Sequence, residues 1–509
     1  MKIVENQTVI LGPPGCGKTT TLLDIVDKEL KAGTEPEEIA FLSFTRKAVN
    51  EAADRASKKF GLNRSRFPYF QTIHSMCFRA LGLSRSLMMD RHNYDELGDW
   101  LGYKMSVRVD IADGSLIFPD DEKGTKLLFL DNYARITNLG IERSLKETRT
   151  SISYTEAERF CRGYEHYRKS RGLFDFTDLL SKMLEEERTI GTKVVIVDEA
   201  QDLSFLQWEV IKSAFRNVNH AYIAGDDDQS IFKWSGADLT SFLKLTGDVR
   251  ILSQSYRLPL VVHSRAARLI SRVKQRFPKE FNPTDKQGSI TFVPSLDFVK
   301  LDPNESTMVL CRNVFLMKDV HSFLENRSVS FEGRGNYKSV DPDHIRAIMA
   351  WEKMRKGLAL NLEDALHMYS FLRIGEILDR GGKSELSKVK DLEIKLHYES
   401  FKMFFGLKAA PIWHKALLGI PAEQREYYIS LLRSGVKLLQ PPNVSVNTIH
   451  GVKGGEADHI ILLSDMAKRT YEEMQLDPCS EVRVAYVGLT RSKNKVTIVQ
   501  PSSCFKFDY

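Results

Sequence analysis

The chain has 509 residues, of which 42% are hydrophobic and 28% are charged, with a formal net charge of +6. This predicts a globular protein of roughly two to four domains. The six cysteines show no Cys-x-x-Cys spacing, so that neither a zinc site nor an iron–sulfur cluster is indicated. No apolar run approaches the length of a membrane span, and we expect no signal peptide. We expect a reduced, cytoplasmic protein whose mild positive charge does not identify a partner.

The first predicted strand, residues 8–11, runs directly into the segment GPPGCGKTT, and a helical pattern follows it. Strand, glycine-rich loop and helix are the context that the phosphate-binding motif G-x-x-x-x-G-K-[ST] requires. Lys18 would reach the outer phosphates of a nucleotide, and the Thr19 hydroxyl would bind Mg²⁺. The alternative is an ordinary glycine turn. We assign nucleotide binding to Gly12, Pro13, Pro14, Gly15, Cys16, Gly17, Lys18, Thr19 and Thr20.

A second predicted strand, residues 39–43, ends at Phe44, Thr45 and Arg46, before a helix that begins at about residue 47. In open parallel sheets, ligands bind beyond the carboxyl ends of the strands. An aromatic ring, a hydroxyl and a cation there can contact a nucleic acid, although a turn with a half-buried Phe is as good an interpretation.

In residues 82–170 the alternation of strand, loop and helix patterns stops. The pattern there is helical and charged, and it predicts an inserted helical subdomain. We expect the sheet to resume at residues 174–180, and then to continue in the apolar strand 194–197. Asp198 and Glu199 follow that strand, where buried carboxylates are costly unless they have a role. Asp198 would hold the Mg²⁺ that Thr19 also holds, and Glu199 would polarise the attacking water.

A strand at residues 221–224 precedes Gln229, which is placed to sense a γ-phosphate, and the aromatic pair Phe232 and Trp234, which can stack on bases. A further strand at 249–252 precedes Tyr256, a candidate for stacking on adenine, and Arg257, a candidate arginine finger.

In the second half of the chain, the sequence again predicts strands and helices. Strands are expected at 307–311, 444–449, 460–463 and 495–499, and the helix 480–490 places Arg483, Tyr486 and Thr490 on one face. Residues 337–439 read as helices with charged faces and predict a second inserted subdomain.

With these segments in place, the chain resembles the UvrD/Rep/PcrA family of superfamily 1 (1A) DNA helicases. The motifs occur in the family's order from residue 9 to residue 499: GPPGCGKTT, LSFTRKA, QTIHS, FDFTDLL, VIVDEAQD, AGDDDQSIFKW, SYR, NTIHGVKGGE and YVGLTR. VDEAQD and GDDDQSIFKW together are specific to this family and its close relatives.

The resemblance implies an α/β fold with two RecA-like P-loop motor domains, each a parallel sheet flanked by helices and each carrying a mainly helical insertion. We expect residues 1–81 and 171–248 to form motor 1A, 82–170 subdomain 1B, 249–336 and 440–509 motor 2A, and 337–439 a compact subdomain 2B.

The resemblance also implies that ATP and Mg²⁺ bind between the motors. Its cleft residues would be Lys18, Thr19, Asp198, Glu199, Gln201, Gln229, Arg257 and Arg491, with Glu456 near the ribose. Single-stranded DNA would contact Phe44, Thr45, Arg46, Thr72, His74, Phe232, Trp234, Thr448 and His450, although a lone His such as His74 is more often a structural cap. The expected partners are single-stranded DNA and single-strand/duplex junctions, with unidentified replication or repair proteins.

Two functions remain open within this resemblance. The first is an ATP-dependent, 3′→5′ helicase that couples hydrolysis to strand separation. The second is a translocase that displaces proteins with little unwinding, which the compact insertions suggest. The compact form would suit a phage-encoded or small accessory enzyme, and the expected location is intracellular and nucleoid-associated. A nucleotide-gated scaffold with little turnover is disfavoured, because Glu199, Gln229 and Arg257 are all present.

Overall fold

The computed structural model places the chain in two units, formed by Met1–Gly288 with Glu473–Thr490 and by Ser289–Glu472 with Arg491–Tyr509. The structure describes residues 1–43, 46–110, 115–118, 122–391 and 393–509. The chain therefore passes between the units three times, and helix α20 (Pro478–Leu489) belongs to the first unit. None of the helices in the described ranges combines the length and apolar character needed to cross a bilayer.

The first unit is built on a six-stranded sheet in the order β3-β2-β6-β7-β1-β8. Every neighbouring pair of its strands is parallel. The strands are β1 (Gln7–Leu11), β2 (Ile39–Ser43), β3 (Phe70–Thr72), β6 (Val194–Val197), β7 (His220–Gly225) and β8 (Asp248–Ile251). Because all of them run in one direction, their carboxyl ends meet at one edge of the sheet.

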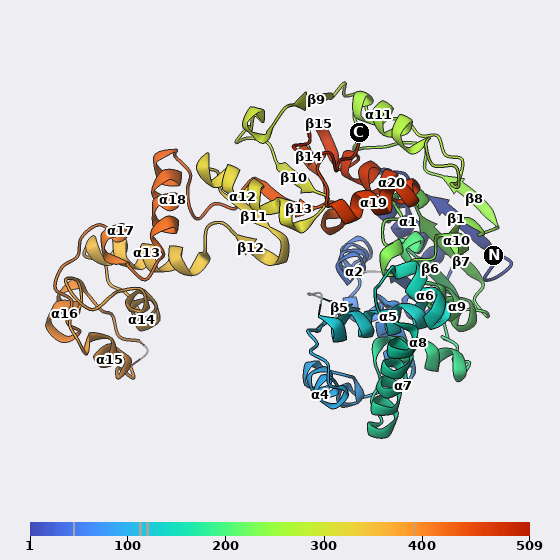
Figure 1. The fold of residues 1–509 in the computed structure, drawn as a ribbon, viewed down its shortest axis with the longest axis horizontal. Coiled ribbons are helices and arrows are strands. Elements are labelled where there is room, and N and C mark those ends of the chain that lie inside the picture. The colour runs from blue at the N-terminus through green and yellow to red at the C-terminus, as the bar shows by residue number, and fades with distance from the viewer. Residues whose placement is uncertain (44–45, 111–114, 119–121, 392) are drawn as a thin grey trace. The chain divides into compact units, whose positions relative to one another are not determined.

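Helices cover both faces of this sheet (Figure 1). They are α1 (Lys18–Lys31), α2 (Arg46–Phe60), α3 (Ile73–Ala80), α8 (Phe176–Glu185), α9 (Phe205–Ala214) and α10 (Leu239–Leu243). The first unit also contains α11 (Leu260–Ile270) and α20 (Pro478–Leu489), which contact each other. Successive strand residues point into different cores, so that Val9 packs with Trp208 while Ile10 packs with Leu22 and Val26. This double burial explains why the strands read as continuous apolar runs.

The predicted insertion at 82–170 is mainly helical and has its own core around Tyr94, Leu127 and Phe160. Its helices are α4 (Arg91–Leu101), α5 (Lys123–Thr137), α6 (Gly140–Thr148) and α7 (Tyr154–Arg171). It also contains a two-stranded antiparallel sheet of β4 (Arg108–Asp110) and β5 (Ser115–Ile117), which the sequence analysis did not predict.

The second unit contains a seven-stranded sheet in the order β12-β11-β13-β10-β14-β15-β9. Its strands are β9 (Ser289–Val293), β10 (Thr307–Cys311), β11 (Phe331–Gly333), β12 (Tyr337–Lys338), β13 (Val444–Thr448), β14 (Ala457–Leu463) and β15 (Ser492–Val499). Within the described residues of this sheet, only the β11–β12 pair is antiparallel. Helix α12 (Met317–Asn326) belongs to the same unit, and α19 (Lys468–Leu476) begins in it and continues into the first unit after Glu472. The predicted α/β class with two parallel-dominated sheets is confirmed.

The other predicted insertion forms a helical body with a core around Trp351, Tyr369 and Trp413. Its helices are α13 (Pro342–Arg355), α14 (Leu362–Ser370), α15 (Gly382–Ser387), α16 (Tyr398–Phe404), α17 (Trp413–Ala416) and α18 (Ala422–Arg433).

The structure corrects one prediction. Residues 174–180 do not rejoin the sheet, because α8 begins at Phe176. Asp175 is the N-cap of this helix: its carboxylate accepts from the Asp178 N–H at 2.8 Å, and the Asp178 carboxylate accepts from the Asp175 N–H at 2.9 Å. This reciprocal capping box overrides the short apolar run that suggested a strand.

The expected boundary between residues 248 and 249 falls inside β8, which pairs with β1 in the first sheet. The segment that follows, with α11, also belongs to the first unit as far as Gly288. The expected division into subdomains stays a prediction in its other boundaries.

The buried carboxylate of Asp175 gives a stability prediction. It accepts hydrogen bonds from Arg135 and from the Tyr164 hydroxyl. Burial opposes its charge, but Arg135 and Arg168 outweigh that effect and hold the pKa of Asp175 well below its usual range. Asp175→Ala should lower the free energy of unfolding by about 2–3 kcal/mol, because Arg135 and Arg168 lose the buried carboxylate that they share and keep only Asp131 and Asp178 as partners. Urea unfolding at neutral pH measures the change.

Asp175→Asn is the matched variant, because asparagine still caps a helix. It should be more stable than Asp175→Ala by about 1 kcal/mol at neutral pH. In both variants the difference from the unmodified chain should shrink as the pH falls, since the lowered pKa of Asp175 stabilises the fold only while the carboxyl is ionised. Equal stability of all three proteins at neutral pH would contradict the proposed ion network.

Candidate nucleotide site

The predicted phosphate loop joins the end of β1 to the start of α1. Gly12 donates its N–H to the Gly225 carbonyl of the neighbouring strand at 3.0 Å, which fixes the start of the loop. Gly15 and Gly17 have φ of 72° and 75°, which L-residues rarely adopt. The first N–H groups of α1 have no partner within the helix and are available to an anion.

The other residues predicted for nucleotide binding lie along the same loop. Pro13, Pro14 and Cys16 are buried, Thr19 is half-buried and Thr20 is exposed in the first turn of α1. Burial raises the pKa of the Cys16 thiol to about 11, so the thiol is protonated at neutral pH.

Lys18 lies against the two carboxylates that follow β6. Its Nζ is 2.6 Å from Glu199 Oε1 and 3.8 Å from Asp198 Oδ1. Burial opposes the charge of the Lys18 ammonium, but the two carboxylates outweigh it and raise the pKa of Lys18. Glu199 is a non-glycine residue with φ of 52°, a strained backbone conformation that aims its side chain at the loop. The structure thus brings Lys18, Asp198 and Glu199 together.

Two glutamines extend this cluster to the end of β7. Gln201 donates to Glu199 Oε2 at 2.6 Å and accepts from the Asp226 N–H at 2.9 Å. Gln229 donates to Asp226 Oδ2 at 2.8 Å. Both glutamine side chains are buried and hydrogen-bonded, so their positions are fixed relative to Glu199.

The segment after β8 packs onto the phosphate loop. Ser255 Oγ donates to the Pro14 carbonyl at 2.8 Å, and the Tyr256 N–H donates to the Gly15 carbonyl at 2.8 Å. A Cβ on Gly15 would lie 2.3 Å from Arg257 Cβ, so only glycine fits there. Arg257 donates to the Thr490 carbonyl at 3.3 Å, and the Tyr256 side chain is 75% exposed. Tyr256 and Arg257 therefore lie beside the loop, where a base and a terminal phosphate would be bound.

The aromatic residues predicted to contact DNA lie in the loop that follows β7. We call residues 232–234 of this loop the aromatic loop. Phe232 and Trp234 have ring centroids 6.4 Å apart in an edge-on arrangement, and Trp234 is 58% exposed. Between them, Lys233 forms an ion pair of 2.6 Å with Asp477, the N-cap of α20.

The remaining predicted DNA contacts of the first unit lie after β2 and β3. Arg46 is exposed at the start of α2, whereas Phe44 and Thr45 lie outside the described residues. Thr72 caps α3 by accepting from the Ser75 N–H at 3.3 Å. His74 is half-buried against Phe176, and burial lowers its pKa to about 4, so the ring is neutral.

Four predicted residues lie in the second unit. Thr448 ends β13 and accepts from the Gly451 N–H at 3.2 Å, and His450 begins the short 3₁₀ turn that follows. Glu456 pairs with Lys493 at 2.8 Å. Arg491 is only 2% exposed and donates to the Gly455 carbonyl at 3.4 Å.

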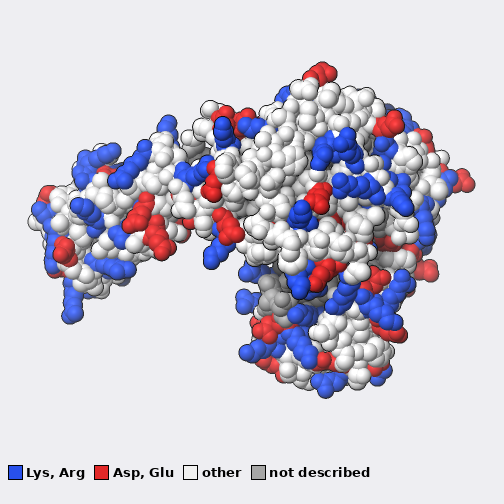
Figure 2. All heavy atoms as spheres, turned by 45° about the horizontal axis from the view of Figure 1, so that its top comes forward, with Lys and Arg blue, Asp and Glu red and all other residues white. Residues whose placement is uncertain are grey.

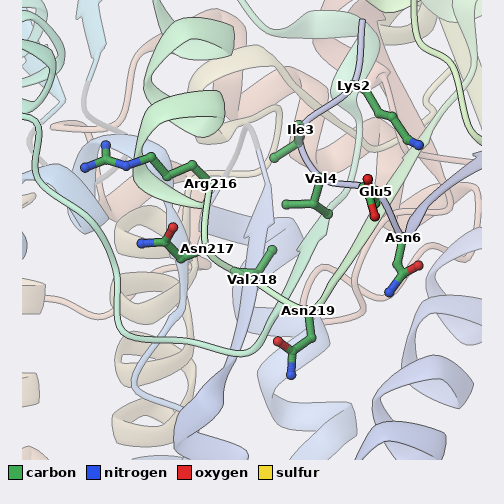
Figure 3. A pocket seen from close by; sticks show the side chains of 9 residues that line it. All are labelled: Lys2, Ile3, Val4, Glu5, Asn6, Arg216, Asn217, Val218 and Asn219. Atoms are coloured by element: carbon green, nitrogen blue, oxygen red, sulfur yellow. The ribbon is translucent and has the colours of Figure 1, made fainter.

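A surface pocket of about 580 Å³ lies elsewhere in the first unit (Figure 3). It is lined by Lys2, Ile3, Val4, Glu5, Asn6, Arg216, Asn217, Val218 and Asn219. These residues precede β1 and β7, so the pocket is at the amino ends of the strands, and the phosphate loop is at their carboxyl ends. The pocket is therefore separate from the candidate site.

Residues 1–250 match the UvrD/REP helicase N-terminal domain family. The chain is a UvrD/Rep/PcrA-like protein. The family resemblance expected from the motifs is thereby confirmed, and the match covers the phosphate loop, both carboxylates and the aromatic loop.

Individual UvrD/Rep/PcrA-like relatives support the same assignment. The chain is 26% identical over 329 residues to an ATP-dependent DNA helicase Rep of Buchnera aphidicola subsp. Baizongia pistaciae, covering 60% of this chain and 47% of that protein. It is 24% identical over 295 residues to an ATP-dependent DNA helicase PcrA of Staphylococcus aureus, covering 55% and 40%. A probable DNA helicase II homolog of Mycoplasma capricolum is 24% identical over 399 residues, covering 69% and 53%. The chain thus spans about half the length of the curated relatives it matches.

The close approach at Gly15 gives a prediction for nucleotide binding. Gly15→Ala should weaken binding of a fluorescent ATP analogue by about tenfold or more, because the new Cβ meets Arg257 and the backbone has a left-handed φ. Gly33→Ala is the matched control, since Gly33 also has a positive φ of 91° but its Cβ would meet nothing within 4 Å. Equal affinities of the two variants would contradict the packing of the 255–257 segment on the loop.

Proposed function

We propose that this protein is an ATP-dependent DNA helicase or translocase that moves along single-stranded DNA, with 3′→5′ polarity. The observation that carries the proposal is the connected group of Lys18, Glu199, Gln201 and Gln229 beside Arg257 in one unit. A binding module would not need a water-polarising carboxylate and a phosphate sensor held in one hydrogen-bonded network.

The residues around the loop fit a nucleotide triphosphate. The loop offers glycines in left-handed conformations, the amino end of α1 and a buried ammonium. Thr19 and Asp198 would hold Mg²⁺, which would neutralise charge on the phosphate oxygens. Tyr256, with its exposed ring beside the loop, would stack on the base.

The ion pair between Lys18 and Glu199 suggests how binding prepares hydrolysis. In the structure Lys18 neutralises Glu199. A bound triphosphate would compete for the ammonium, and Glu199 would then be free to accept a proton from water while Gln201 keeps its carboxylate in place. Gln229 and Arg257 would contact the terminal phosphate.

The aromatic loop supports contact with single-stranded DNA. Trp234 and Phe232 present aromatic faces, on which bases stack without sequence preference. Charge alone does not identify a DNA track, because Lys and Arg lie among Asp and Glu over the face shown in Figure 2. The proposal therefore rests on the aromatic pair and not on a basic field.

In the proposed motor the second unit supplies Arg491 to the phosphates, Glu456 to the ribose, and Thr448 and His450 to the DNA. Binding and hydrolysis would then change the position of one unit against the other. The alternative function is a translocase that displaces proteins from DNA with little unwinding. For either activity, replication or repair proteins would be the cellular partners of this protein.

Lys18→Ala tests the hydrolytic half of the proposal. Single-stranded DNA should stimulate ATP hydrolysis by the unmodified chain, and the variant should lose at least about 100-fold in kcat because the phosphate charge loses its main partner. Its affinity for single-stranded DNA should be unchanged. Lys31→Ala, which changes an exposed lysine of the same helix, should behave like the unmodified chain. ATP turnover that is indifferent to DNA would contradict the proposal.

The unmodified chain also distinguishes the helicase from the protein-displacing translocase. Forked duplexes with only a 3′ or only a 5′ single-stranded arm report the direction of movement, and a protein block on single-stranded DNA reports displacement. Strong unwinding of 3′-tailed forks supports the helicase, whereas displacement without unwinding supports the alternative. Unwinding confined to 5′-tailed forks would contradict the proposed polarity.

Trp234→Ala tests the DNA contact. Loss of one stacking ring should weaken binding of single-stranded DNA by about 1–3 kcal/mol and should raise the DNA concentration needed to stimulate hydrolysis. Fluorescence anisotropy with a labelled oligonucleotide measures the affinity. Trp100→Ala is the control, because Trp100 is also half-exposed but lies on α4. Identical DNA affinities of the two variants would show that the β7 loop does not stack on bases.

A further inference from the structure

Three consecutive aspartates follow β7, and each is at most 1% exposed. A single ammonium contacts all three carboxylates: Lys279 Nζ is 2.7 Å from Asp226 Oδ1, 3.0 Å from Asp228 Oδ2 and also bonded to Asp227 Oδ1. The Lys279 side chain is itself 1% exposed, and Arg276 adds a two-point contact to Asp228. Neither cation was predicted from the sequence.

The Asp226 carboxylate connects this cluster to the nucleotide site. Oδ1 accepts from Lys279, and Oδ2 accepts from Gln229 at 2.8 Å. The backbone N–H of Asp226 donates to Gln201, which in turn donates to Glu199. Two short chains of hydrogen bonds therefore lead from Lys279, one to Gln229 and the other to Glu199.

The segment that carries Lys279 is anchored on both sides. The Phe277 N–H donates to Asp227 Oδ2 at 3.0 Å. Arg483 of α20 donates to the Asp227 carbonyl at 2.9 Å and to the Gln275 carbonyl at 2.8 Å. Lys279 is therefore held in one place, and it holds Asp226 in one orientation.

We propose that Lys279 is a positioning residue for ATP hydrolysis. By pairing with Asp226 and orienting it, Lys279 fixes Gln229 through the Asp226 carboxylate, and Glu199 through the Asp226 N–H and Gln201. Without the ammonium, three carboxylates in a low-dielectric environment would repel one another, and Asp226 would protonate or rotate away from Gln229. This inference rests on the function proposed above, because it assigns Lys279 a role in that reaction.

A purely structural role makes a different prediction from a positioning role. The Asp227 carboxylate accepts from Lys279 and from the Phe277 N–H, so it can be neutralised while Asp226 keeps its charge. The double variant Lys279→Met/Asp227→Asn removes one charge of each sign and keeps the balance of the cluster. If Lys279 only balances charge, the double variant regains activity. If Lys279 positions Asp226, the double variant regains stability but remains slow.

The experiment compares four variants with the unmodified chain: Lys279→Met, Lys279→Arg, the double variant and Lys274→Met. Lys274 is an exposed lysine of the same segment and serves as the control. In DNA-stimulated hydrolysis, Lys279→Met and the double variant should lose roughly 10- to 100-fold in kcat, as is typical when a residue that orients a reacting group is removed, with KM for ATP little changed. Lys279→Arg should recover part of kcat, and Lys274→Met should match the unmodified chain.

Hydrogen–deuterium exchange on the nucleotide-free proteins gives a second readout that does not need turnover. Residues 226–231 and 199–203 should exchange faster in Lys279→Met and in the double variant than in Lys274→Met. Full kcat in Lys279→Met or in the double variant overturns the proposal, and so does unchanged exchange in both segments. If the unmodified chain hydrolyses no ATP, the proposed function fails, and the exchange data alone then decide whether Lys279 orders the two segments.

Discussion

The candidate site depends on the neutralisation of buried charge at one edge of a parallel sheet. Lys18 lies against Glu199 and Asp198, and Lys279 lies against the three aspartates after β7. An ion in a low-dielectric environment is tolerated only with a well-placed partner, and removing one partner costs more than the pair contributes. Each of these side chains is therefore constrained by the others, which gives a hydrolytic site the fixed geometry that it needs.

The strand order explains why residues far apart in sequence meet there. The central strands lie in the order β6-β7-β1-β8, and all run in the same direction. Asp198 and Glu199 follow β6, Gln229 follows β7, the phosphate loop follows β1 and Arg257 follows β8. The loops after four neighbouring strands therefore lie close together at one edge of the sheet. The strands that carry these loops are held in place by apolar residues buried on both faces of the sheet.

The strands that were predicted correctly are those in which an apolar run in the sequence corresponds to a strand buried on both faces of the sheet. The strands expected at 39–43, 194–197 and 307–311 have those bounds, because each is a continuous apolar run buried on both faces. The edge strand β9 was missed, since its residues are mostly exposed and show no apolar run. Residues 174–180 were misassigned because a capping signal at Asp175 was read as part of a strand.

Residues of the candidate site could be predicted from the sequence only where they lie in a recognisable motif. The phosphate loop, Asp198, Glu199 and Gln229 lie in short motifs with a physical meaning, whereas Lys279 lies about fifty residues beyond its aspartate partners in sequence with no local pattern around it. The only signal was the aspartate run itself. Three carboxylates directly after a buried strand require a cation, but sequence does not say which of the chain's lysines and arginines supplies it.

Helix α20 shows how such long-range contacts bear on the proposed mechanism. Within the first unit, its N-cap Asp477 pairs with Lys233 of the aromatic loop, Arg483 binds the carbonyl of Asp227, and Thr490 at its end accepts from Arg257. The loop with Phe232 and Trp234, the loop with the three aspartates and the candidate arginine finger are therefore all bonded to one helix. The next residue, Arg491, leads into β15 of the second unit. In the proposed motor, nucleotide state and DNA contact would both act on this helix, from whose end the chain continues into the second unit, and α20 would then couple them.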